Sequence, residues 1–147
     1  MTGKVISINI SKEKGTPKEQ INPGVLIENF GFENDAHAGK WHRQVSLLAK
    51  ESIEKSTDSN ESEKYIGKFA ENITTEGIEL YTLPIGTKLK IGKSLLEITQ
   101  IGKECHDGCA IKKAVGKCIM PKEGVFCKVI KGGEVYIGDR IAVITEE

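Results

Sequence analysis

Two of the chain's three histidines, His37 and His42, lie in a loop from Gly31 to Gln44 that also holds Asp35, Arg43 and the single tryptophan. Imidazole and guanidinium groups donate hydrogen bonds to anions, and a glycine-containing loop leaves such donors near solvent. We therefore predict that Asp35, His37, His42 and Arg43 contribute to a cofactor-binding site. In the alternative interpretation the tryptophan is a core side chain and the histidines only cap nearby backbone groups.

Cys105 lies in a second segment with reactive side chains, residues 100–113. A thiol of ordinary pKa, about 8.5, needs a neighbouring cation, an imidazolium or a helix N-terminus to ionise at neutral pH. Lys103 and His106 flank Cys105, and a short helix is predicted over Cys109 to Val115. The pattern predicts that Cys105 is the reactive thiol, with Lys103 and His106 as cofactor-binding residues.

The remaining cysteines allow different roles. Cys109 or Cys118 would serve as an auxiliary sulfur acceptor or soft-metal ligand beside Cys105. A zinc site of Cys105, Cys109, Cys118 and a histidine would satisfy the usual four ligands, but the irregular intervals do not favour it. Cys127 lies in an ordinary strand pattern and is predicted to be a packing residue.

Lysines gather between the second segment and the following loop, residues 116–126. Lys112 and Lys113, together with Lys117 and Lys122, would form a cationic rim that receives an anionic cofactor. The alternative is a solvated basic face with no ligand.

Composition bounds the remaining possibilities. A length of 147 residues and 38% hydrophobic content predict one domain, residues 1–147, with a core of its own. Lys plus Arg total 21 and Asp plus Glu total 21, so the formal net charge is zero. The composition therefore does not favour nonspecific electrostatic binding to nucleic acid or anionic lipid. No apolar window of about 20 residues and no signal region is present, which favours a cytoplasmic protein without membrane partners.

The elements that must position these residues are mostly strands. An opening strand from Val5 to Ile10 precedes a loop over residues 11–23, and alternation around Gly92 and Lys93 predicts a hairpin over residues 88–99. A second hairpin is predicted around Gly132 and Gly133, and a last strand over residues 140–145. Residues 45–53 have roughly helical spacing, so the longest helix is expected to start near Ser46. Short strands with one or two short helices predict a mainly β fold, a small closed barrel.

In this order, the segments resemble the MOSC domain, named for the C-terminal part of molybdenum cofactor sulfurases. The resemblance rests on the opening strand, the loop with Asp35, and Phe69 to Ile78, which is similar to the family's F-x-E-N-hydrophobic-T-x-x-G element. It continues through residues 83–86 and 96–100 to Cys105, and through residues 132–139.

The resemblance implies a closed β-barrel and a link to molybdenum cofactor chemistry. It implies that Cys105 carries sulfur as a persulfide or ligates the metal of a molybdopterin cofactor, with molybdenum cofactor biosynthesis proteins or molybdoenzymes as partners. Pyridoxal phosphate is associated with the family through fused sulfurase domains, and no lysine here marks a Schiff-base former. The extra N-terminal β domain of larger relatives is absent, which favours a carrier or delivery module.

Two other functions stay open on the sequence alone. One is a small-ligand or metal-binding module without turnover. The other is a molybdenum-dependent reductase of N-hydroxylated compounds, like some MOSC relatives.

Overall fold

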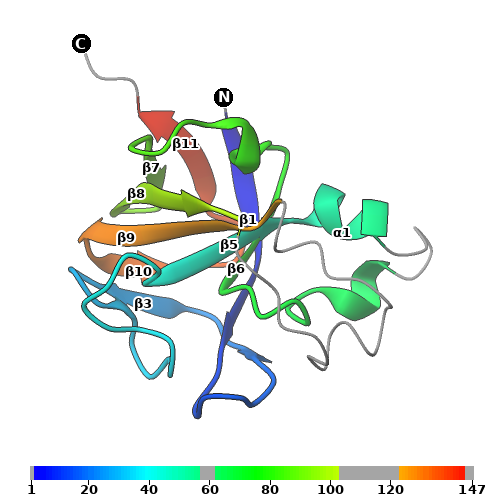
Figure 1. The fold of residues 1–147 in the computed structure, drawn as a ribbon, viewed down its shortest axis with the longest axis horizontal. Coiled ribbons are helices and arrows are strands. Elements are labelled where there is room, and N and C mark those ends of the chain that lie inside the picture. The colour runs from blue at the N-terminus through cyan, green and yellow to red at the C-terminus, as the bar shows by residue number, and fades with distance from the viewer. Residues whose placement is uncertain (1, 57–61, 103–122, 145–147) are drawn as a thin grey trace.

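The computed structural model describes residues 2–56, 62–102 and 123–144. Seven strands form a barrel in the order β11-β7-β8-β9-β5-β6-β1, which a pairing between β1 and β11 closes (Figure 1). Neighbours are antiparallel except β5 and β6, which run parallel. The barrel strands are β1 (Thr2–Ile10), β5 (Val45–Ala49), β6 (Ile73–Glu76), β7 (Lys88–Ile91), β8 (Ser94–Ile101), β9 (Val125–Lys131) and β11 (Arg140–Ile144). The predicted mainly β, closed barrel is confirmed.

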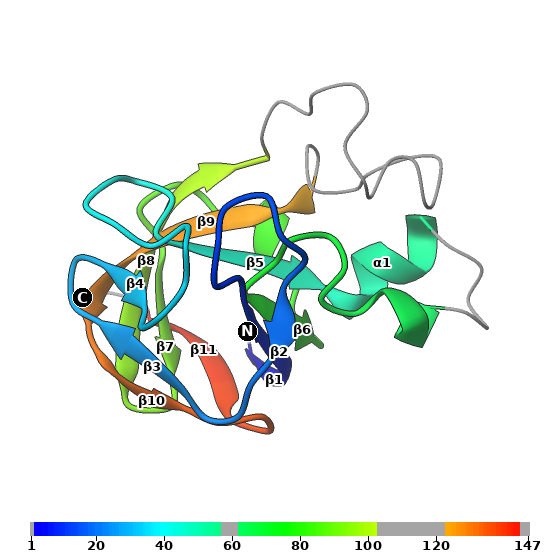
Figure 2. The ribbon, with the colours of Figure 1, turned by 90° about the horizontal axis from the view of Figure 1, so that it is seen from below.

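A smaller sheet and a few short helices complete the described part of the chain. In the smaller sheet β3 lies between β10 and β4, and β2 pairs with the end of β1. Figure 2 shows β3 and β10 on the opposite side of the molecule from α1. These elements are β2 (Glu19–Gln20), β3 (Gly24–Ile27), β4 (Gly31–Phe32), β10 (Gly133–Val135), α1 (Lys50–Ser56), and the 3-10 helices η1 (Ser62–Tyr65) and η2 (Leu80–Thr82). None of the helices in these residues is long and apolar enough to cross a bilayer.

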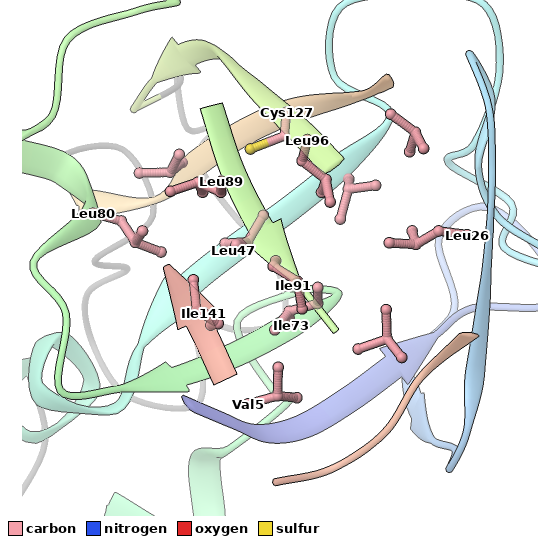
Figure 3. Packing of buried hydrophobic residues seen from close by; sticks show 14 of the residues in the cluster. Val5, Leu26, Leu47, Ile73, Leu80, Leu89, Ile91, Leu96, Cys127 and Ile141 are labelled. Atoms are coloured by element: carbon pink, nitrogen blue, oxygen red, sulfur yellow. The ribbon is translucent and has the colours of Figure 1, made fainter. Parts of the chain in front are cut away.

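The barrel core is aliphatic and continuous. Alternate side chains of the barrel strands meet inside it, and Figure 3 shows Leu47, Leu89 and Leu96 converging from three of them. All three are fully buried. Burial of this apolar surface is the main favourable contribution to the stability of the fold.

The first predicted hairpin is confirmed. β7 and β8 pair antiparallel with Lys88 opposite Glu97, and the two residues Gly92 and Lys93 join them. Gly92 has φ of 58°, a left-handed conformation that glycine adopts without steric cost. The opening and closing strands, β1 and β11, are also found where the sequence predicts them.

The expectation of a helix starting near Ser46 is wrong, because residues 45–49 form β5 and α1 begins only at Lys50. Leu47 points into the barrel core, whereas Leu48 belongs to a second cluster with Ile53 and Phe69. A strand buried on both faces reads as a continuous apolar run, which periodicity alone does not distinguish from a helix.

The second predicted hairpin is also wrong. β9 and β10 follow each other around Gly132, but β10 pairs with β3, with Glu134 opposite Val25. A Cβ atom at Gly132 would lie 2.4 Å from the carbonyl oxygen of Leu26, so the chain crosses to the smaller sheet at backbone contact distance. The predicted loop over residues 11–23 likewise contains the two-residue strand β2.

The crossing at Gly132 gives a stability prediction. Gly132→Ala is expected to lower the free energy of unfolding by about 1–3 kcal/mol, because the added methyl group overlaps the backbone of β3. Urea denaturation measures the change. Ile85→Ala is the control, because Ile85 is 65% exposed and its truncation should have little effect. An unchanged midpoint for Gly132→Ala would contradict the close approach.

Candidate functional site

The loop that carries the predicted anion donors begins at a buried ion pair. Lys18 Nζ lies 3.0 Å from Asp35 Oδ1, and the two side chains are only 3% and 0% exposed. The same oxygen accepts the backbone N–H of Ser11 at 3.0 Å, and Asp35 Oδ2 accepts Nδ2 of Asn72 at 3.1 Å. The carboxylate of Asp35 is thus bound by groups of the protein and anchors the loop.

Asn72 connects this ion pair to the barrel. Its Nδ2 also donates to the carbonyl oxygen of Asn9 at 3.0 Å, and its Oδ1 accepts the backbone N–H of Ser46 at 2.9 Å. The Ser46 hydroxyl donates to the same Oδ1 at 3.2 Å. Asn72 therefore joins the end of β1, the start of β5 and the loop at Asp35.

The neighbouring Glu71 is a fully buried carboxyl group. It accepts the backbone N–H groups of Gly67 and Phe69 at 2.9 and 3.1 Å and the Thr74 hydroxyl at 2.7 Å. Burial raises the pKa of Glu71. These hydrogen bonds lower the pKa, but by less than burial raises it. Glu71 holds the turn that leads into Asn72 and β6.

His37 lies beside the ion pair. Its Nδ1 is 3.4 Å from Lys18 Nζ, and its carbonyl oxygen accepts the indole N–H of Trp41 at 3.0 Å. The side chain of His37 is partly buried. The lysine that holds Asp35 therefore also helps to place the first histidine of the loop.

His42 is held by the last residues of β8. The side-chain amide of Gln100 donates to the carbonyl oxygen of Gly102 at 2.7 Å, which leaves Gln100 Oε1 as the group 2.8 Å from His42 Nε2. Because that oxygen only accepts, Nε2 carries a proton. The hydroxyl of Thr99 also donates to the carbonyl oxygen of His42.

Arg43 lies against two aromatic rings. Its Cζ atom is 4.7 Å from the ring centroid of Trp41 and 5.6 Å from that of Phe126. Nε of Arg43 is buried and has no hydrogen-bond partner among the described residues. A buried charged donor without an acceptor costs about 1–3 kcal/mol or more, so this nitrogen is suited to an anion supplied from outside the described chain.

The loop ends beside β8 and β9, the two described strands on either side of residues 103–122. His42 contacts Gln100 before this gap, and Arg43 contacts Phe126 after it. The backbone N–H of Gly102 donates to the carbonyl oxygen of Gly124 at 2.7 Å. This hydrogen bond holds together the two described residues that lie close to the ends of residues 103–122.

Several predicted site residues lie outside the described residues. The structure therefore leaves their assignment as a prediction, as it does the helix predicted over Cys109 to Val115. These residues are Lys103, Cys105, His106, Cys109, Lys112, Lys113 and Cys118.

Cys127 has the packing role predicted for it. It is fully buried, and its sulfur lies in the barrel interior near Leu96 and Leu89 (Figure 3). Burial raises the pKa of its thiol far above the ordinary value, and the charge of Glu97 adds to this. Cys127 is therefore unsuited to bind a metal or carry sulfur.

Within the described residues, no metal centre competes with the loop as a site. Residues 2–56, 62–102 and 123–144 contain no group of three or more His, Cys, Asp or Glu side chains arranged to hold a metal ion. An open pocket of about 460 Å³ lies on the outside of the barrel next to Ile85 and Ile144. No predicted site residue lines it.

Sequence reasoning identified His37, His42 and Arg43 as neighbours because they are close in the chain. It missed Lys18 and Gln100, which hold the loop from positions far away in sequence. Lys18 lies in a lysine-rich polar stretch, so its residue type carried no signal. Gln100 had only its place at the end of a predicted strand.

The buried ion pair gives a second prediction. Lys18→Met and Asp35→Asn are each expected to lower the free energy of unfolding by about 3–5 kcal/mol, because each leaves a buried group without its partner. The double variant should cost less than the sum, since no uncompensated charge remains. Urea denaturation at pH 7 measures all three variants. Lys4→Met is the control, because the Lys4–Glu76 pair is largely exposed and is worth at most about 1 kcal/mol. Additive effects would contradict direct coupling.

Comparisons with solved structures agree with this fold. No curated protein matches the sequence. The YuaD protein from Bacillus subtilis has a TM-score of 0.79 at 17% identity, covering 100% of this chain and 98% of that chain. YiiM from Escherichia coli has a TM-score of 0.68 at 19% identity, covering 100% and 71%. YiiM from Geobacillus stearothermophilus has a TM-score of 0.69 at 18% identity, covering 97% and 75%.

These structures share the fold of this chain. The family model for the MOSC domain matches residues 34–142, which include the loop from Asp35 to Arg43 and the barrel strands from β5 to the first part of β11. The chain therefore belongs to the MOSC domain family, which is linked to molybdenum cofactor-related functions.

Proposed function

We propose that this protein carries sulfur or delivers a molybdenum-pterin cofactor, binding the anionic part of its ligand at Arg43 and using the Cys105 thiol. The observation that carries the proposal is the buried Nε of Arg43, which has no acceptor among the described residues. The guanidinium is held in place between two aromatic rings before any ligand arrives. A donor that is already ordered loses little conformational entropy on binding.

The donors around Arg43 fit a phosphate group. Arg43 presents its buried Nε–H group, whereas the Nε2–H group of the neighbouring His42 is already donated to Gln100. Asp35 is the nearest acid in the loop, but Lys18 neutralises it within the protein. A guanidinium binds two oxygens of a phosphate at once, which an ammonium group does not do.

The thiol part of the proposal comes from the sequence. A molybdenum-pterin cofactor would supply a metal centre with affinity for thiolate sulfur, and a persulfide likewise needs a thiolate. Cys127 is unsuited because it is buried and its pKa is raised. Cys105 has Lys103 and His106 beside it in the chain, and both favour the thiolate. Lys112, Lys113, Cys109 and Cys118 would complete the site in this proposal.

The anion-binding step is tested by Arg43→Ala. We expect the affinity for inorganic pyrophosphate to fall about tenfold or more, because a hydrogen bond from a charged donor contributes about 1.5–3 kcal/mol. Isothermal titration calorimetry measures the affinity. The matched control is Arg140→Ala, which removes the only other arginine, an exposed residue of β11. Equal losses in both variants would show a nonspecific charge effect and contradict the proposed site.

The thiol step is tested by alkylation at pH 7 followed by peptide mapping. Cys105 should be labelled well before Cys127, whose thiol is buried and has a raised pKa. Cys105→Ser should fold normally, by circular dichroism, but lose sulfane sulfur or molybdenum when purified from the native host. Unchanged loading of the variant would show that the thiol has been misassigned.

A further inference from the structure

Trp41 is a large aromatic side chain that stays exposed in an otherwise well-anchored loop. It is 41% exposed, although its indole N–H donates to the carbonyl oxygen of His37 at 3.0 Å. The His42 ring meets it edge-on, with centroids 5.9 Å apart, and Arg43 lies over its ring. The alternative interpretation, in which the tryptophan is a core side chain, is therefore wrong.

These contacts fix the orientation of the indole ring and cover one of its faces. Arg43 lies 4.7 Å from the centroid on that face, so the exposed area belongs mainly to the other face and the free edge. Exposing this much aromatic surface forgoes favourable burial. A rigid, exposed aromatic ring binds a planar partner at low entropic cost, which is why such residues serve as anchors in binding sites.

We propose that Trp41 is a stacking platform for a planar heteroaromatic ring whose phosphate is bound at Arg43. The inference rests on the proposed function and adds the residue that recognises the ring. In this proposal, Trp41 makes the protein bind a heteroaromatic phosphate more tightly than a simple phosphate. Stacked rings lie about 4.5 Å or more apart between centroids. With Arg43 at 4.7 Å on the opposite face, ring and guanidinium are separated by about 9 Å, which requires a linker between ring and phosphate.

The single tryptophan makes its own fluorescence a direct reporter of this contact. The test titrates the full chain with GMP, guanosine and inorganic phosphate. GMP should quench Trp41 fluorescence and bind at least tenfold more tightly than phosphate. Guanosine should also quench it, but only at higher concentration, because it lacks the group that Arg43 binds.

Variants separate stacking from a structural role for Trp41. By calorimetry, Trp41→Leu should weaken GMP binding about tenfold to a hundredfold, the range for loss of one base-aromatic stack. It should weaken phosphate binding much less, because Phe126 still contacts Arg43. Trp41→Phe should retain most of the GMP affinity, because it keeps a ring at this position. Tyr136→Ala is the matched control, because it removes another exposed aromatic ring, one that lies between β10 and β11.

The outcomes distinguish this inference from the proposed function. If Trp41→Leu weakens GMP and phosphate binding equally, or if Trp41→Phe behaves like Trp41→Leu, Trp41 only positions Arg43 and the stacking role is overturned. If wild-type protein binds phosphate through Arg43 but prefers GMP no more than phosphate, the stacking role fails and the anion site stands. If neither ligand binds, both the stacking role and the anion site are overturned.

Discussion

The arrangement of the site depends on the buried ion pair between Lys18 and Asp35. Removing two charges from water is costly, and their attraction offsets that cost only when the remaining hydrogen-bonding capacity is filled. Here Ser11 and Asn72 fill it for the carboxylate. The pair therefore forms only when the segment after β1, the loop after β4 and the turn before β6 are all in place. The ion pair therefore joins three segments that are distant in sequence, and it fixes the start of the loop that carries His42 and Arg43.

The two ends of the loop segment from Asp35 to Arg43 differ in how completely their polar side-chain atoms are hydrogen-bonded. Asp35 has a partner for each carboxylate oxygen, whereas Arg43 has a buried nitrogen without an acceptor in the described chain, and Trp41 keeps an exposed ring. Unsatisfied buried donors are rare in folded proteins and call for an explanation. The contrast within nine residues indicates that stability is concentrated at one end of the loop and ligand recognition at the other.

The sequence could predict the parts of this structure that local pattern determines. The β7–β8 hairpin follows from alternation around Gly92, and the cluster of His37, His42 and Arg43 follows from closeness in the chain. The strand character of residues 45–49 could not be predicted locally, because it depends on α1 and Phe69 covering its outer face. The partners of Asp35 and His42 could not be predicted either, because Lys18 and Gln100 are distant from them in sequence and meet them only in the tertiary structure.

The barrel also divides the chemistry of the site between two parts of the chain. Its closed aliphatic interior takes in Cys127 and suppresses ionisation of that thiol, so the same packing that stabilises the fold removes this sulfur from any reaction with a metal or a sulfur donor. In the proposed function, thiolate chemistry falls to cysteines of residues 103–122. The described residues on either side of this segment are joined by a backbone hydrogen bond between Gly102 and Gly124. His42 and Arg43 lie against the strands on either side of that junction. The rigid barrel orders the anion donors. In the proposed function the thiols belong to a separate connection that begins and ends beside these donors, so each group keeps the environment that its chemistry requires.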